Sequence, residues 1–192
     1  MEKKFILTDK FVINSFGIKL FQIKCTKSFK YAQKGDFGGY VEKEGNLDQE
    51  NDAWVSGNAW VSDNARVSGD AWVSDNAWVS GNARVFGNAR VSGNARVSGD
   101  AWVSGNAWVS GDADIENDNE HCGFDGFGSC NRHTHAYMTK EKKVEIICGC
   151  FRGSIEEFEK KVEETHSGTV YEKQYKSIIN VIKIKFGLTD FT

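Results

Sequence analysis

The hydrophobic and polar positions in the middle of the chain repeat every six residues. From Asp52 the sequence reads DAWVSG NAWVSD NARVSG DAWVSD NAWVSG NARVFG NARVSG NARVSG DAWVSG NAWVSG DADIEN. Ala fills one slot of every unit, and Val fills the slot two residues later until Ile115 closes the series. Residues two apart share one face of an extended strand, so Ala and Val point inward and the intervening Trp or Arg points outward.

The three remaining positions of each unit, Ser-Gly-Asn or a variant, predict a corner. Gly and Asn both tolerate the positive φ that a tight turn requires. A helix is excluded, because Gly at such regular intervals would be costly in one. Antiparallel hairpins would set the Ala and Val slots of identical units out of register, whereas a parallel coil superposes them. We therefore predict a parallel β-helix over residues 52–116, with three units per triangular turn.

The repeat resembles a known family. Val-Ser-Gly-Asn-Ala-Trp is similar to the bacterial transferase hexapeptide, and this resemblance implies a left-handed parallel β-helix. The chain as a whole resembles a group of phage and prophage proteins through three stretches: GDFGGYVEKEGNL, the NARVSG-type repeats and CGCFRGSIEEFEKKVEETH. That resemblance implies a phage-encoded protein with a C-terminal α/β domain, and no single function.

With three units per turn, the outward Trp and Arg residues stack in three columns, each neighbour roughly 4.8 Å from the next. All six Trp of the chain lie in these columns. One reading is a surface that stabilises itself through stacked indole and guanidinium groups. We favour an interface, since Trp and Arg are enriched at binding hot spots and six exposed Trp would be hard to leave in water. The predicted interface consists of Trp54, Trp72, Arg90 and Trp108; Trp60, Trp78 and Arg96 (with Asp114 closing that column); and Arg66, Arg84 and Trp102.

Residues 1–51 predict a β cap with an irregular first turn. A turn around residues 14–17 precedes a strand containing Ile18, Leu20 and Ile23. If the six-residue register is extended backwards, Val41 and Leu47 occupy the Ala slot, while Lys43 and Gln49 occupy the inward Val slot. Polar residues in an inward slot indicate a terminal turn that departs from the repeat.

Residues 117–192 predict a small α/β domain. An acidic, Gly-rich hinge, ENDNEHCGFDGFGSC, should lead to strands at Arg132–Met138 and Lys143–Cys150. Ser154 and Glu157 form a capping box for a helix that Ser167-Gly168 ends. A second helix is expected over Tyr171–Phe186. The fold class is therefore mainly β: a left-handed parallel β-helix between an N-terminal β cap and a C-terminal domain of two strands and two helices.

Charge and composition exclude several classes of protein. The net charge is −3, and Lys is absent from Glu44 to Thr139, so nucleic acid is disfavoured as a partner. No segment is apolar enough to span a membrane. The start, MEKKFILTDKF, lacks the apolar core of a secretory signal, so we expect a cytoplasmic protein with five free cysteines.

Candidate chemistry is confined to the C-terminal part. Seven potential zinc ligands lie there, but no Cys-x-x-Cys pair exists, so buried thiols and surface histidines are favoured over a metal. The better ligand candidates are two turns, one with Ser129 and Asn131, and one at the start of a helix, where free amides would suit an anion. For the second turn we favour the alternative, a capped helix after a Gly turn without a ligand. The second turn consists of Arg152, Gly153 and Ser154. The weighed metal ligands are His121, Cys122, Cys130, His133, His135, Cys148 and Cys150.

These observations favour a binding protein over an enzyme. The repeats contain no His and no inserted loop, so we assign no catalytic residue and no cofactor. We expect a phage-encoded, non-enzymatic binding or assembly protein that forms a dimer or trimer and binds a host defence protein or a nucleotide signal. A virion or tail-associated structural protein is the alternative, and a hexapeptide acyltransferase is a minor one.

Overall fold

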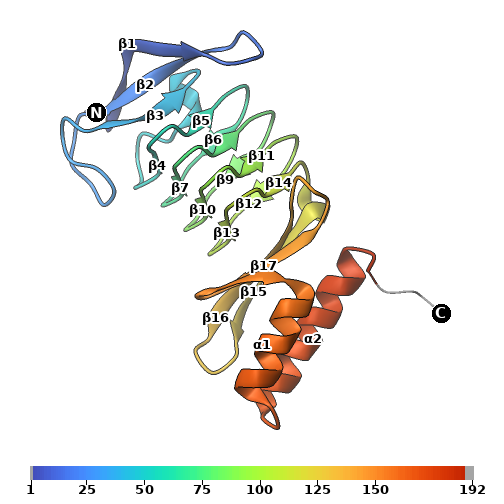
Figure 1. Cartoon of the computed structure of the whole chain (residues 1–192). Coiled ribbons are helices and arrows are strands. Elements are labelled where there is room, and N and C mark those ends of the chain that lie inside the picture. Colours follow the sequence, from blue (N-terminus) through green and yellow to red (C-terminus); the bar gives the residue numbers. More distant parts are fainter. Residues whose placement is uncertain (1, 189–192) are drawn as a thin grey trace. The chain divides into compact units, whose positions relative to one another are not determined.

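The computed structural model describes residues 2–188, and the chain divides into two compact units between Asn117 and Asp118. The first unit is a parallel β-solenoid preceded by three longer strands, and the second is a four-stranded sheet with two helices (Figure 1). Neither helix in the described residues has the length and apolar content needed to cross a membrane.

Eleven two-residue strands build the solenoid, and each of the first eight pairs in parallel with the strand three places further along the chain. The partners are eighteen residues apart, as in Trp54 with Trp72. The predicted parallel coil with three units per turn is confirmed. The strands are β4 (Trp54–Val55), β5 (Trp60–Val61), β6 (Arg66–Val67), β7 (Trp72–Val73), β8 (Trp78–Val79), β9 (Arg84–Val85), β10 (Arg90–Val91), β11 (Arg96–Val97), β12 (Trp102–Val103), β13 (Trp108–Val109) and β14 (Asp114–Ile115).

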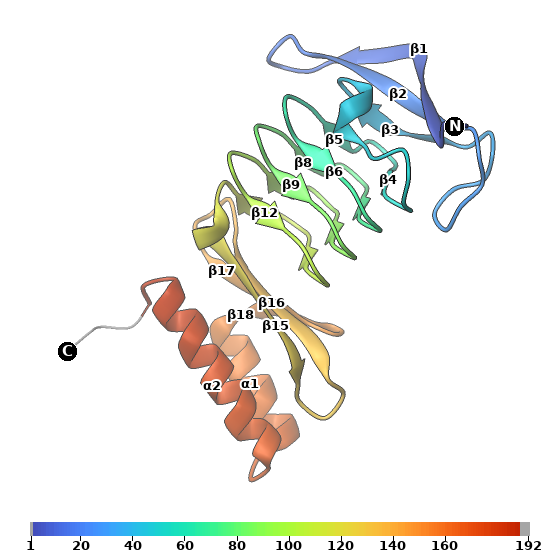
Figure 2. The same ribbon diagram turned by 180° about the vertical axis from the view of Figure 1, so that it is seen from behind.

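The solenoid has three faces. The first face consists of β4, β7, β10 and β13, the second of β5, β8, β11 and β14, and the third of β6, β9 and β12. Figure 2 shows the third face. Each face carries one of the predicted columns, because the first residue of each strand, which is Trp or Arg except for Asp114 in β14, pairs with its equivalent one turn away.

The interior is a stack of Ala and Val. All of these inward side chains from Ala53 to Ile115 are buried. Backbone hydrogen bonds join the turns, as from Trp54 N–H to the carbonyl of Ala71 at 2.9 Å and from Trp72 N–H to Ala89 at 2.9 Å. The interior side chains are nearly the same in every turn and therefore determine only the shape of the coil. The residues that differ between units lie on the outside.

Positive φ at the corners falls on the Gly slot, not on the Asn slot that follows it. Asp63 and Asp75 replace Gly in this slot, with φ of 56° and 60°. Each carboxylate accepts a hydrogen bond from the Gly N–H one turn further on, at 3.1 Å for Asp63 and 2.9 Å for Asp75. The corner Asn residues instead form amide ladders, as in Asn58 to Asn76 at 3.3 Å.

Three longer strands continue the second face toward the N-terminus. They are β1 (Phe5–Ile13), β2 (Lys19–Cys25) and β3 (Phe37–Val41), followed by the short 3₁₀ helix η1 (Glu44–Asn46). β1 and β2 form an antiparallel hairpin, β3 pairs antiparallel with β2, and β3 then pairs in parallel with β5. The predicted turn before Ile18 is confirmed, since Asn14 N–H donates to the Ile18 carbonyl.

The predicted register of the first turn is wrong by two residues. Val41 pairs with Val61 and Leu47 with Val67, so both occupy the Val slot and not the Ala slot. Two extra residues between Leu47 and Val55 account for the shift. The reason is burial: the observed register puts two aliphatic side chains inward and leaves Lys43 exposed, whereas the expected one would bury a lysine.

The C-terminal unit begins with a second 3₁₀ helix and an antiparallel sheet with the strands in chain order. The two helices follow the last strand. The elements are η2 (Asp118–Glu120), β15 (His121–Phe127), β16 (Arg132–Met138), β17 (Val144–Cys148), β18 (Phe151–Ser154), α1 (Ile155–His166) and α2 (Val170–Lys185). Both predicted helices are confirmed, and Ser154 caps α1 by accepting a hydrogen bond from Glu157 N–H.

Two parts of this unit differ from the prediction. The expected hinge is largely η2 and strand β15, whose Cys122 and Phe124 pack against the core under the helices. In β15 the apolar residues alternate with polar residues and Gly, and this alternation was not recognised in the sequence because Gly and Asp are typical of loops. The expected strand Lys143–Cys150 ends at Cys148, because Gly149 turns the chain with a φ of 61° into β18. Cys148 is therefore buried while Cys150 is exposed, so the two thiols do not share one face of a strand.

Candidate functional site

The expectation that all six Trp are exposed is wrong, because aromatic residues from the N-terminal part cover several of them. Trp54 is 2% exposed and packs against Phe29 at 5.3 Å between ring centroids. Tyr31 stacks on Trp72 at 5.6 Å, and Phe16 contacts Trp78 at 5.5 Å. The covering residues lie in the loop after β2 and in the β1–β2 turn. Trp102 and Trp108 keep 47% and 41% of their surface exposed.

Among residues 2–188, the third face carries two exposed arginines and an exposed Trp. Arg66, Arg84 and Trp102 follow one another along its column. The Arg84 guanidinium lies 4.8 Å from the centroid of the Trp102 ring, a cation–π distance. Similar contacts occur on the other faces, where Arg96 lies 4.5 Å from Trp78 and Arg90 lies 5.9 Å from Trp72.

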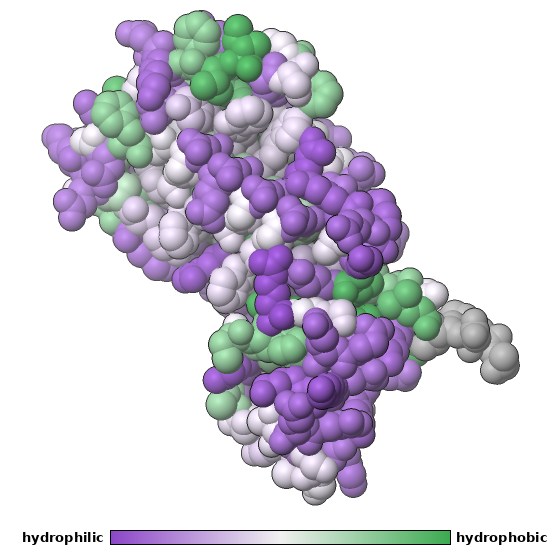
Figure 3. Space-filling model, viewed as in Figure 1, coloured by the Kyte–Doolittle hydropathy of each residue, from purple (hydrophilic) through white to green (hydrophobic). Residues whose placement is uncertain are grey.

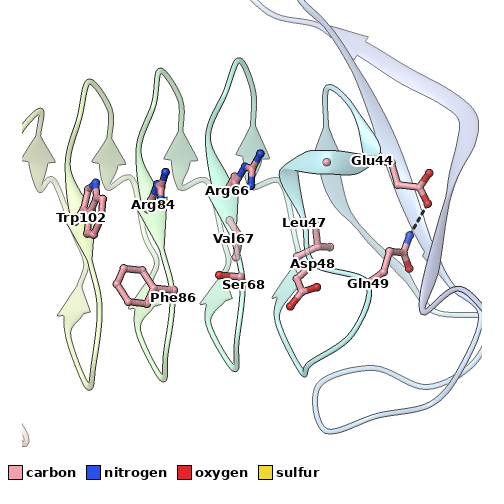
Figure 4. A pocket seen from close by; sticks show the side chains of 11 residues that line it. Glu44, Leu47, Asp48, Gln49, Arg66, Val67, Ser68, Arg84, Phe86 and Trp102 are labelled. Atoms are coloured by element: carbon pink, nitrogen blue, oxygen red, sulfur yellow. Dashed lines mark hydrogen bonds between the residues drawn. The ribbon is translucent and has the colours of Figure 1, made fainter.

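A hollow of about 730 Å³ lies beside this column. We call it the third-face hollow. Its base is formed by Val67 and Ser68, Phe86 stands at one end, and the segment 44–49 stands at the other, as Figure 4 shows. Arg66 and Arg84 line one side. Its volume falls within the range typical of small-molecule sites.

Phe86 makes this hollow, and its sequence signal was missed. Every other unit from Ser56 to Ser110 has Ser in this slot. The Phe86 ring meets Trp102 edge to face at 6.1 Å. The large Phe86 side chain therefore projects beyond the small Ser68 in the same column and bounds the hollow on one side. The break in the repeat at NARVFG was visible in the sequence and marks the site.

The charges around the hollow are unevenly compensated. Within residues 2–188, neither Arg66 nor Arg84 makes an ion pair with a carboxylate. Glu44, in contrast, pairs with Lys3 at 2.8 Å and accepts a hydrogen bond from Gln49 at 2.6 Å. Although burial alone would raise the pKa of Asp48, hydrogen bonds from Glu50 N–H and the Asn51 amide keep that pKa below its usual value. Glu44 and Asp48 are thus engaged in contacts within the chain, whereas Arg66 and Arg84 are exposed to solvent.

The helix start that was a candidate anion site is occupied by the protein's own acids, which agrees with the favoured alternative of a capped helix. Arg152 forms a two-point ion pair with Glu145, with distances of 2.6 and 3.3 Å. Ser154 N–H donates to the Glu157 carboxylate at 2.8 Å, and Ser154 Oγ donates to Glu156 at 2.8 Å. An incoming anion would meet two carboxylates where free amides were expected.

The other predicted ligand turn contains Ser129 and Asn131. It connects β15 and β16, and Asn131 adopts a left-handed conformation with φ of 48°. Gly128 N–H in the same turn donates to the Gln174 side chain on α2 at 3.0 Å, which ties the turn to the helix. This turn is bound to Gln174 on α2, whereas Arg152 of the other predicted turn is bound to Glu145 on β17, so the two predicted ligand turns are held by different elements.

Three histidines come together in the C-terminal sheet, and their expected surface position is wrong. His135 is 1% exposed, and its Nε2 lies 3.1 Å from Nδ1 of His121. The His133 ring lies 5.6 Å from that of His135, and its Nδ1 contacts Asp125 at 2.8 Å. Alternation along β16 puts His133 and His135 on one side of the strand.

The cysteines do not join these histidines. All five are free; Cys25 and Cys148 are buried, while Cys130 and Cys150 are exposed. Burial raises the pKa of the Cys122 thiol to about 11, so it stays protonated at neutral pH. Across residues 2–188, no three His, Cys, Asp or Glu side chains are arranged to hold a metal ion.

Comparison with known families supports the solenoid. Residues 59–75, 77–93 and 89–105 match the family model described as the YdcK beta solenoid repeat. A comparison with curated proteins found no match. The matched segments lie within the solenoid and, together with its parallel strand pairing, define the class: the chain is a repeat β-solenoid protein with a small C-terminal unit of sheet and helices.

Proposed function

We propose that this chain is a non-enzymatic binding protein whose solenoid presents the third face to a partner or ligand. The observation that carries the proposal is the pair Arg66 and Arg84, which have no acidic partner within residues 2–188 and stand beside the exposed Trp102. Arg and Trp are the residues that most often dominate binding energy. A strand column on a solenoid holds them at fixed spacing, so little ordering entropy would be lost on binding.

The biological setting proposed here rests on resemblance. The NARVSG-type repeats and the CGCFRGS tail favour a phage-encoded protein that acts in the host cytoplasm, with a host defence protein or a nucleotide signal as its target. The similarity to the transferase hexapeptide favours a left-handed coil. We further propose that β1, β2 and β3 act as the cap of the solenoid, since β3 pairs with β5 of its first turn and β2 and β1 extend the same sheet.

We also propose that the chain forms a dimer or trimer, and the structure shifts attention to a different surface for this contact. Phe11, Ile13 and Phe16 of the β1–β2 hairpin are 45%, 63% and 68% exposed. Figure 3 shows hydrophobic side chains gathered at this hairpin. β1 is also the last strand of its sheet, with one edge unpaired by another strand in the described chain. Exposed apolar groups beside a free strand edge favour association with a second copy.

The test of the binding proposal is affinity capture from infected cells with the wild type and two matched variants. Trp102→Ser removes the exposed indole of the third face, and Arg90→Gln changes an exposed arginine at the equivalent position of the first face. We expect Trp102→Ser to lose the captured protein or small molecule and Arg90→Gln to retain it. Equal capture by both variants would overturn the assignment of the third face. Recovery of the chain only with intact virus particles would overturn the binding proposal in favour of a structural role.

A further inference from the structure

The third-face hollow combines a cationic side with an aromatic end. Building on the proposed binding function, we infer that this hollow binds a nucleoside phosphate, with the phosphate on Arg66 and Arg84 and the base against Phe86 and Trp102. The ligand class follows from three features of the hollow: the arginine pair, the aromatic platform and the closed acidic end.

The arginine pair provides the phosphate site. Arg66 and Arg84 pair in register on neighbouring turns, which lie roughly 4.8 Å apart. Two cationic side chains on neighbouring strands repel each other, and an anion bound between them would offset this repulsion. Arginine binds phosphate through two parallel N–H donors, so the pair can hold one or two phosphate groups. Arg84 is also held over Trp102, which fixes its direction before a ligand arrives.

The aromatic end provides the base site. Phe86 is half-buried, and its ring is fixed edge to face against Trp102. Bases stack on such rings with a gain of roughly 1–3 kcal/mol each. The small Ser68 one turn earlier leaves the space that a flat ring would fill. Neither a simple anion nor an apolar molecule would use both ends of the hollow.

The segment 44–49 limits the ligand at the opposite end. The carboxylates of Glu44 and Asp48 lie there, and both already accept hydrogen bonds or ion pairs from their own chain. Negative charge at this end disfavours a second phosphate site beyond Arg66. The hollow is therefore suited to a ligand with one anionic end, and a long polyanion such as a nucleic-acid strand would meet these acids.

The experiment is titration calorimetry of the full chain with ADP, GDP, CDP and UDP, followed by adenosine and inorganic pyrophosphate separately. We expect at least one diphosphate to bind, and each separate half to bind more weakly. Arg84→Gln and Phe86→Ser should each weaken binding about tenfold or more, because they remove the phosphate contact and the base platform. Arg90→Gln should bind as the wild type does.

Phe86→Ser is a strong variant here because it restores the residue found in every neighbouring unit, so the solenoid should fold normally; its thermal unfolding provides the check. No binding of any of the four diphosphates at millimolar concentration overturns the inference, as does unchanged binding by Phe86→Ser. The two proposals fail separately. If nucleotides do not bind but Trp102→Ser still loses its captured partner, the third face remains the binding face and only the ligand class is wrong.

Discussion

Lys4 is a buried lysine at the start of the solenoid. Its Nζ donates to the carbonyls of Asn51 and Ala53 at 2.6 and 2.8 Å and lies 5.2 Å from the Phe29 ring centroid. Burial lowers the pKa of Lys4 from 10.5 to about 8, against the opposing effect of Asp48 and other acids. The amine donates hydrogen bonds to two carbonyl groups of the first turn. Because its pKa is lowered, it loses its proton at a lower pH than an exposed lysine does.

This gives a pH dependence with a definite sign. Between pH 8 and 10.5 the unfolded chain keeps the lysine proton while the folded chain has lost it. Stability therefore rises with pH across this interval relative to a protein without the group. We expect the free energy of unfolding of the wild type, measured by urea unfolding, to increase relative to that of Lys4→Met between pH 8 and 10.5. Lys10→Met, at an exposed lysine of β1, should run parallel to the wild type; a parallel Lys4→Met curve would contradict the assignment.

At the scale of the strand and corner, the sequence predicts the solenoid well because each element is local. The Ala, Val and Gly slots recur within one unit, and the same three choices give the strand, its inward face and its turn. The N-terminal register fails because two extra residues between Leu47 and Val55 interrupt the six-residue period, so counting backwards from the repeats puts Val41 and Leu47 in the wrong slot. Strand β15 was missed because its Gly and Asp residues are typical of loops.

The corners predict a difference between two glycines with the same backbone conformation. Gly81 and Gly105 both have φ of +64°, where a side chain costs roughly 1–2 kcal/mol. A Cβ on Gly81 would also lie 2.9 Å from Gly99 N and 3.0 Å from its carbonyl oxygen, while a Cβ on Gly105 would meet nothing within 4 Å. We expect Gly81→Ala to lower the urea midpoint clearly more than Gly105→Ala. Equal losses would mean that the turns can separate to accept a methyl group.

At the scale of the whole molecule, each unit has its own core. Ala and Val fill the solenoid, whereas the C-terminal core lies between the sheet and α1 and α2, with Ile179 only 1% exposed. The covering of Trp54, Trp72 and Trp78 was not predictable, because Phe29, Tyr31 and Phe16 reach them from far along the chain. Phe86 was predictable in principle, as the one departure from Ser in its slot.

The two cores can be followed by separate signals. All six Trp lie in the solenoid, and both helices lie in the C-terminal unit. Ile179→Ala removes buried volume from the C-terminal core and should cost about 2–5 kcal/mol there. We expect the midpoint of helical ellipticity to fall by more than the midpoint of Trp fluorescence. Identical shifts in both signals would mean that the chain unfolds as one cooperative body.

The triangular turn has a consequence for how such a gene can change in length. Inserting or deleting eighteen residues adds or removes one full turn, so every later side chain stays on its own face. Inserting a single six-residue unit keeps the Ala and Val core equally intact but moves every later residue to the next face. Placed between Arg66 and Arg84, such a unit would separate the two arginines without harming the fold. Recognition is therefore far more sensitive to the length of the repeat than stability is.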